Sequence, residues 1–261
     1  STSRRQRQMC IRDSIDPASD IDTINTELIL SDMEILERRI QRTSKAAKAD
    51  KSLQGELAVL NRISQWLGEG KNARAMELDD DEAAFVKTLD LLSYKPIIYV
   101  ANVSDDEVSA DDNQYVQQVR QIAATENAQV TVICAEIEAE VAELEDEERA
   151  MFLEELGVSE SGLDKLIKAS YSLLDLISFL TAGEPEVRAW TVKRGTKAPG
   201  AAGKIHSDFE KGFIRAETIA YDKLIECGGN LATAKEKGLI RSEGKDYVVK
   251  DGDVMHFLFN V

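Results

Sequence analysis

Apolar side chains recur at three- and four-residue steps in two runs near the start of the chain, with a polar interval around Asp50 between them. The members of these runs are Ile21, Ile24, Leu28, Met33, Leu36 and Ile40, and then Leu53, Leu57, Leu60, Ile63 and Leu67. This spacing places each run on one face of a helix. We therefore expect residues 15–75 to form a helical hairpin or coiled-coil arm.

The start of the first helix carries capping signals. Pro17 is tolerated in a first turn, Asp22 suits the helix dipole, and the Ser19 hydroxyl can accept a backbone N–H. Asp16–Pro17 followed by Ser19-x-x-Asp22 therefore predicts the start of a helix. Residues 1–14 contain four Arg, one acid and no apolar periodicity, and we expect them to be an artefactual or disordered segment.

Two short apolar runs in the middle of the chain have a different pattern. Ile97–Val103 and Gln129–Cys134 contain β-branched residues and end in polar positions, which is typical of strands buried on both faces of a parallel sheet. The helical pattern of Tyr115–Ala123 between them makes one β-α-β crossover unit. Because ligands of such sheets bind at the carboxyl ends of the strands, a site is expected at Asn102–Asp105 and Cys134–Glu136.

The rest of the chain predicts a second, smaller domain. Helices are expected from Asp79, over Asp146–Leu156 and over Gly162–Leu176. Strands are expected near Val187, Phe213, Tyr247 and Val254, with short helices at Ala198 and Asn230. A few short helices against a mixed sheet suit a β-grasp, ubiquitin-like fold, so the predicted fold class is α/β with this second domain.

The charge of the chain is unevenly distributed. The formal net charge is −16, yet residues 188–250 hold thirteen Lys and Arg against eight acids. Arg38, Arg42 and Lys45 also recur at helical spacing near the tip of the predicted arm. Two interpretations of these bases stay open, an ordinary solvated surface or contacts with RNA phosphates.

The three cysteines lie far apart and suggest neither a disulfide framework nor a zinc site.

Four stretches of this sequence carry a resemblance to a known family. They are Lys95–Val103 (KPIIYVANV), Val187–Thr191 (VRAWT), residues 201–219 (AAGKIHSDFEKGFIRAETI) and residues 244–261 (GKDYVVKDGDVMHFLFNV). The chain resembles the YchF-type, Obg-like ribosome-binding ATPases over residues 16–261. The resemblance implies a helical arm at 15–75, the C-terminal part of a P-loop nucleotide-binding domain at 76–177 and a TGS domain at 178–261.

The resemblance also implies roles for the residues at the strand ends. Asn102, Val103, Ser104 and Asp105 match the base-recognition loop, and Cys134 and Ala135 match the second base-side loop. A GTPase has Lys where this chain has Val103, and the family carries Glu where it has Asp105. A carboxylate cannot grip adenine as it grips guanine, so ATP is expected to bind through backbone around Val103. Cys134 is equally consistent with a buried structural thiol.

No G-x-x-x-x-G-K-[ST] motif occurs in the 261 residues. That motif supplies the amide nest for phosphates and a hydroxyl ligand for Mg²⁺. The resemblance implies that the Mg²⁺ ligands and this loop precede Asp16, that the complete protein hydrolyses ATP, and that these residues alone hold neither a catalytic residue nor a metal site.

The expected partner is the ribosome, through its large or small subunit and its RNA. The residues expected at this contact are Arg38, Arg42 and Lys45 of the arm, and Lys204, His206, Lys211 and Arg215 of the C-terminal domain. For His206 a loop-bracing hydrogen bond is the alternative. Neither DNA nor a membrane is expected as a partner, because the net charge is acidic and no apolar run approaches about 18 residues; the location is predicted to be cytoplasmic. The rival hypothesis is a non-enzymatic adaptor whose TGS-like domain binds RNA or protein.

Overall fold

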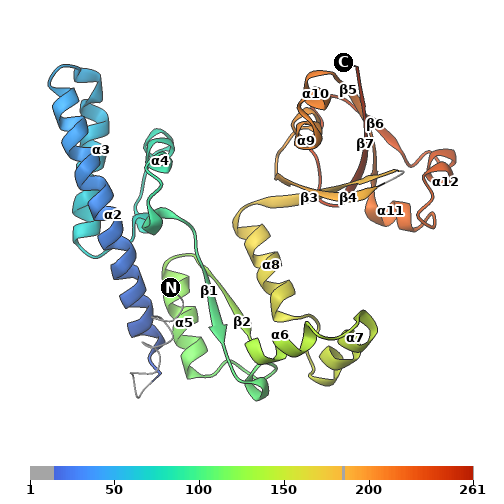
Figure 1. Cartoon of the computed structure of the whole chain (residues 1–261), viewed down its shortest axis with the longest axis horizontal. Coiled ribbons are helices and arrows are strands. Elements are labelled where there is room, and N and C mark those ends of the chain that lie inside the picture. The colour runs from blue at the N-terminus through green and yellow to red at the C-terminus, as the bar shows by residue number, and fades with distance from the viewer. Residues whose placement is uncertain (1–14, 184–185, 261) are drawn as a thin grey trace. The chain divides into compact units, whose positions relative to one another are not determined.

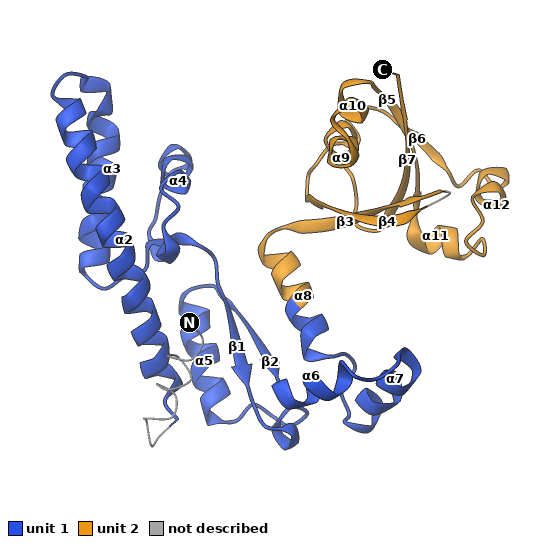
Figure 2. Ribbon diagram, viewed as in Figure 1, with its two compact units in different colours: residues 1–166 blue, residues 167–261 orange. Residues whose placement is uncertain are grey.

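The computed structural model describes residues 15–183 and 186–260, and the expectation for residues 1–14 lies outside them. The chain divides into two compact units, residues 1–166 and residues 167–261 (Figure 2). The first unit contains a helical arm and a parallel sheet, and the second contains a mixed sheet. Both parts of the predicted α/β fold are therefore present.

The arm is a pair of helices that lie side by side (Figure 1). Its helices are α2 (Pro17–Ala47) and α3 (Gln54–Gly68), joined by the 3-10 turn η1 (Lys51–Leu53) at the expected polar interval. Leu36, Leu60 and Ile63 have no exposed surface. Burial of each such side chain contributes about 1.5 to 3 kcal/mol. The apolar spacing of the sequence thus located most of the packed face of the hairpin, but Ile24 is 48% exposed and the buried Ile29 was not predicted.

The first helix begins where the sequence predicts, but its capping acceptor is not the Ser19 hydroxyl. Asp16 caps α2, because its carboxylate accepts a hydrogen bond from the Ser19 backbone N–H at 3.3 Å. Pro17 lacks an N–H and has a φ angle suited to the first helical position, so the helix begins directly after Asp16.

A buried carboxylate joins the arm to the segment that leads into the parallel sheet. Asp32 of α2 is completely buried, and it accepts hydrogen bonds from the backbone N–H groups of Leu92 at 2.8 Å and Ser93 at 2.7 Å, and from the Ser93 hydroxyl at 2.6 Å. These donors belong to the 3-10 turn η3 (Leu92–Tyr94). Hydrogen bonds of this kind make a buried charge tolerable. Two further elements lie between the arm and η3, namely the turn η2 (Ala73–Ala75) and the helix α4 (Asp80–Lys87).

The parallel sheet forms one β-α-β unit, as predicted. Strands β1 (Ile98–Asn102) and β2 (Gln129–Ile133) pair in parallel, and α5 (Gln114–Thr125) makes the crossover. The prediction that these strands are buried on both faces is wrong for β1, in which Val100 is 44% exposed. The reason is that the described residues supply only two strands to this sheet, too few to enclose β1.

Three helices follow the sheet. They are α6 (Ala135–Val141), α7 (Asp146–Glu155) and α8 (Gly162–Leu173). The last ends three residues before the predicted Leu176, because Asp175 adopts a positive φ of 52° that a helix cannot accommodate. The freed residues from Leu176 onward form a strand instead.

The second unit is built on a five-stranded sheet with the order β4-β3-β7-β5-β6. Its strands are β3 (Leu176–Ala182), β4 (Val187–Lys193), β5 (Phe213–Ala220), β6 (Arg241–Glu243) and β7 (Asp253–Phe259). Its helices are α9 (Ala198–Ile205), α10 (Ser207–Lys211), α11 (Tyr221–Ile225) and α12 (Leu231–Glu236). Strands β3 and β7 are parallel and the other neighbours antiparallel, which is the expected β-grasp arrangement.

The sequence mislocated some of these strands. No strand forms at Tyr247, where only Val248 makes an isolated bridge with Lys197. The Asp253 carboxylate accepts hydrogen bonds from the Tyr247 hydroxyl at 2.8 Å and the Lys250 backbone N–H at 2.9 Å, and these local bonds hold a loop in place of a ladder. Neither β3 nor β6 was predicted, and Leu176, the first residue of β3, was expected to end a helix.

The first unit is held together by a buried ion pair. Arg74 and Glu126, with side chains 7% and 13% exposed, lie 3.1 Å apart. The Glu126 carboxylate also accepts hydrogen bonds from the Tyr99 hydroxyl at 2.8 Å and the Asn72 amide at 3.1 Å, while Arg74 donates to Asn25 at 2.9 Å. Residues of α2, β1 and the end of α5 therefore meet around one carboxylate. Burial and the hydrogen bond to Glu126 raise the pKa of Tyr99 to about 12.

We predict that Glu126→Gln destabilises the chain by about 3 to 5 kcal/mol, because it leaves the Arg74 charge buried without its counter-charge. The pKa of Tyr99 should fall, since the carboxylate that opposes phenolate formation is removed. Denaturant unfolding measures the first effect and ultraviolet titration of tyrosine the second. Asp90→Asn is the matched control, because it removes the exposed Lys95–Asp90 pair and should cost less than about 1 kcal/mol. Equal losses in both variants would contradict the assignment.

Candidate functional site

The two predicted base-side loops meet at the carboxyl ends of β1 and β2. In the parallel register Asn102 lies opposite Ile133, so the residues after each strand come together. The Asn102 side-chain oxygen accepts a hydrogen bond from the Ala135 backbone N–H at 2.9 Å, and the Val103 N–H donates to the Ile133 carbonyl at 2.9 Å. These two hydrogen bonds join loops that are 33 residues apart in sequence, and we call them the clasp.

The first loop is braced by two residues that the sequence reasoning missed. The Glu107 carboxylate accepts hydrogen bonds from the Asn113 amide at 2.8 Å and the Ser104 hydroxyl at 2.9 Å. Those bonds lower the pKa of Glu107 below the usual glutamate value, so it stays ionised at neutral pH. The side-chain oxygen of Asn113 also caps α5. An Asn directly before a helical pattern is the sequence signal that would have identified this cap.

The remaining predicted residues of the site differ in exposure. Ser104 and Asp105 are exposed, and Val103 is partly buried. Cys134 is 2% exposed and packs with Ile137 beneath the second loop. Its thiol therefore belongs to an apolar core, which agrees with the structural alternative left open by the sequence. The Ala135 N–H is already bonded to Asn102, so it is not a free donor.

Helix α8 supports the second loop from its far side. The Glu138 carboxylate of α6 accepts hydrogen bonds from the backbone N–H groups of Gly162 at 2.6 Å and Leu163 at 3.0 Å. Gly162 is required for this approach, because a Cβ atom there would lie 2.7 Å from the Ile133 side chain. These contacts therefore anchor the helix that follows the second loop to the start of α8.

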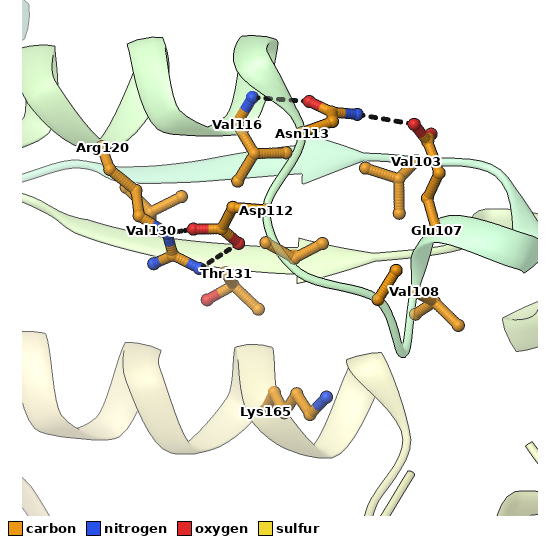
Figure 3. A pocket seen from close by; sticks show the side chains of 12 residues that line it. Val103, Glu107, Val108, Asp112, Asn113, Val116, Arg120, Val130, Thr131 and Lys165 are labelled. Atoms are coloured by element: carbon orange, nitrogen blue, oxygen red, sulfur yellow. Dashed lines mark hydrogen bonds and ion pairs between the residues drawn. The ribbon is translucent and has the colours of Figure 1, made fainter. Parts of the chain in front are cut away.

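A pocket of about 360 Å³ lies next to the first loop (Figure 3). Its wall combines the loop residues Val103 and Glu107, the middle of β2 and Lys165 of α8. The ion pair between Arg120 and Asp112 lies along its edge. Asn102, Asp105 and Ala135 do not line it, so this pocket is beside the candidate base site and not within it.

The predicted basic residues of the arm are exposed on α2. Arg38 and Arg42 line a cleft of about 360 Å³ together with Arg39, which the sequence reasoning missed, and with Thr88 after α4. Lys45 lies further along the same helix and is exposed. Three guanidinium groups at one cleft are suited to bind phosphate oxygens.

The predicted basic residues of the C-terminal unit lie around α9, α10 and β5. Lys204, Lys211 and Arg215 are exposed. The His206 ring accepts a hydrogen bond from the Asp208 backbone N–H at 3.2 Å and caps α10, which is the loop-bracing alternative. Phe209 next to it stacks on Phe259 with ring centres 3.9 Å apart.

Two searches of the described residues, 15–183 and 186–260, gave negative results. None of their helices combines the length and apolar character of a membrane span. No cluster of three or more His, Cys, Asp or Glu side chains there is arranged to hold a metal ion.

We predict that Asn102→Ala breaks the clasp between the loops. Loss of one exposed hydrogen bond is worth about 1 kcal/mol, so hydrogen exchange of the Ala135 amide should speed up roughly five- to tenfold. Exchange followed by NMR measures this at a single residue. Asn102→Asp keeps an acceptor oxygen and should preserve most of the protection. Unchanged exchange in Asn102→Ala would show that the clasp does not hold the loop.

Comparison with known proteins identifies the family. The family model YchF-GTPase_C, described as "Protein of unknown function (DUF933)", matches residues 176–260. The chain is 59% identical over 249 residues to the "Ribosome-binding ATPase YchF" of Bacillus subtilis and 51% identical over 248 residues to that of Escherichia coli O157:H7. Both matches cover 95% of this chain and 68% of the relative.

A solved structure agrees with these relatives. That of the Schizosaccharomyces pombe YchF GTPase superposes with a TM-score of 0.83 at 30% sequence identity, covering 95% of this chain and 68% of that chain. A GTP-binding protein from Pyrococcus horikoshii, 17% identical with a TM-score of 0.59, shares the fold. The relatives and the arm, sheet and C-terminal domain together show that the chain belongs to the YchF family.

Proposed function

We propose that this chain contributes the base-recognition and ribosome-binding surfaces of a ribosome-associated ATPase. The observation that carries the proposal is the 59% identity over 95% of the chain to a protein named a ribosome-binding ATPase. The clasped loops at Asn102 and Ala135 support it, because a nucleotide base needs a rigid edge at the ends of the parallel strands. A ribosomal partner also implies a cytoplasmic location.

The first loop favours adenine because it lacks the Lys side chain that covers guanine in GTPases. Guanine recognition uses a carboxylate that accepts two N–H groups and a Lys stem that covers the base, and here Val103 occupies the Lys position. Adenine presents a donor at N6 and an acceptor at N1, which suits a backbone C=O and N–H pair. The Val103 N–H is bonded to the Ile133 carbonyl, so the N–H of this pair is assigned to a neighbouring residue of the loop. The exposed Asp105 carboxylate offers acceptors alone, so it cannot pair with the N1 acceptor of adenine. The assignment of ATP to the loop therefore rests on Val103 in the Lys position and on the relatives named ATPases.

The residues present do not fit the phosphate chemistry. The 261 residues contain no G-x-x-x-x-G-K-[ST] motif. The described residues also hold no cluster of carboxylates suited to a metal, so no step is assigned to Mg²⁺. Base recognition is accordingly the part of ATP hydrolysis that we assign to these residues, and phosphoryl transfer is not.

Ribosome binding is assigned to the two basic surfaces. Arg38, Arg39 and Arg42 form the cleft on α2, and Lys204, Lys211 and Arg215 lie on the C-terminal unit. Each exposed base that meets an RNA phosphate releases a counterion, which gives affinity without sequence specificity. Ribosomal RNA offers a dense phosphate surface to both.

We predict that the native protein carrying these residues binds ATP more tightly than GTP, and that Val103→Lys reverses this order. The substitution creates Asn-Lys-Ser-Asp at positions 102–105, so relative GTP affinity should rise roughly tenfold or more. Calorimetric titration with both nucleotides measures the ratio. Ser109→Lys adds the same charge at an exposed position nearby and should leave the ratio unchanged. Tighter GTP binding by the unaltered protein would refute the adenine assignment, and no nucleotide binding would favour the adaptor.

We predict that ribosome binding weakens steeply with salt and that Arg38→Gln/Arg42→Gln reduces this dependence. A plot of log affinity against log salt concentration has a negative slope, and the loss of two phosphate contacts should make this slope shallower by about 1.5. Co-sedimentation with ribosomes over a salt series measures it. Lys235→Gln/Lys237→Gln removes equal charge from exposed sites outside the basic surfaces and is the control. Binding that does not respond to salt would contradict the electrostatic account.

A further inference from the structure

An apolar groove lies on the outer face of α7, in the most acidic stretch of the chain. Its volume is about 610 Å³ and its lining residues are Leu144, Glu148, Met151, Phe152, Glu154 and Glu155. Met151 is 71% exposed. A large apolar side chain with this exposure, surrounded by carboxylates, is typical of a binding surface with an apolar centre and a charged rim.

The inner face of α7 is well packed, so the exposure of Met151 does not result from a loose helix. Leu153 is 8% exposed and joins the apolar cluster of Cys134, Ile137 and Val141. Phe152 packs against the same cluster and also lines the groove. The groove therefore has a fixed floor, and only its outer side lacks a covering in the described part of the chain.

The charge of the groove is uncompensated. Residues 136–160 contain eleven acids and one base, Arg149. Arg149 points its guanidinium to Asp164 at 3.3 Å and to the Ser161 hydroxyl at 3.4 Å, both beyond α7, and it does not line the groove. The carboxylates of Glu148, Glu154 and Glu155 are exposed, and none of them forms an ion pair with another described residue.

We propose that the outer face of α7 binds a basic amphipathic segment of a partner protein. An apolar side chain of that segment would fill the groove over Met151 and Phe152, and its Lys and Arg side chains would meet the glutamates of the rim. The flexible, polarisable Met151 side chain adapts to apolar groups of different shape. RNA is disfavoured at this face because its phosphates carry the same charge as the rim. The proposal depends on neither nucleotide nor ribosome binding.

The test uses the full chain and a fluorescently labelled helical peptide of Lys, Ala and Leu, with its Leu residues on one face. Fluorescence anisotropy should show binding that Glu154→Lys/Glu155→Lys weakens about tenfold at low salt. Glu77→Lys/Glu236→Lys changes the net charge equally on exposed sites elsewhere and should have a much smaller effect. Met151→Ser should weaken binding several-fold at low and at high salt, because it removes an apolar contact.

A second peptide with Ser in place of Leu separates the two contributions. It should bind weakly and be insensitive to Met151→Ser. Each variant should melt near the temperature of the unaltered chain, because the substituted side chains are exposed. Thermal melting checks that the variants are folded. Equal weakening by the two double variants, an unaltered affinity in Met151→Ser, or direct binding of a labelled RNA oligonucleotide that Met151→Ser weakens would each overturn the proposal.

Discussion

The ion pair between Arg74 and Glu126 is the interaction on which the first unit depends. Withdrawing both charges from water costs several kcal/mol per ion, and hydrogen bonds from other polar groups offset part of this cost, although the buried Arg74 Nε has no partner among the described residues. Those groups come from different elements, since Asn25 lies on α2 and Tyr99 on β1. The low exposure of the pair, 7% and 13%, leaves few alternative arrangements. The arm and β1 are therefore fixed to each other upstream of the base-side loop.

The parallel pairing of β1 with β2 then determines the geometry of the candidate site. Because β1 and β2 run in the same direction, their ends deliver Asn102 and Ala135 to the same edge. The hydrogen bond between them and the Glu107 brace restrict loops that are otherwise exposed. A base that bound there would meet backbone already held in place, which lowers the entropy cost of binding. The proposed ATP site thus depends on the same packing that fixes the arm.

The sequence predicted the parts of this arrangement that follow from local pattern. Helical spacing located the arm, and two β-branched runs located β1 and β2. Asp16 as the cap of α2 was missed, since Ser19 is as good a capping residue by type alone. Strand β3 was missed because the apolar residues around Leu176 continue a helical spacing until Asp175 adopts its positive φ. The role of Glu126 could not be predicted from the sequence, because its hydrogen-bond partners lie 27 to 54 residues away along the chain.

A net charge of −16 is compatible with binding to RNA because charge acts locally in salt solution. At physiological ionic strength the screening length is about 8 Å, so a phosphate near Arg38 or Arg42 responds to those guanidinium groups and hardly to distant carboxylates. The acidic α7 follows the same rule with the opposite sign, since Glu154 and Glu155 repel phosphate and attract a basic peptide. The basic cleft lies on α2 and the acidic groove on α7, and this separation allows the chain to attract RNA at one surface and a basic segment at the other, whereas a uniform mixture of the same residues would attract neither.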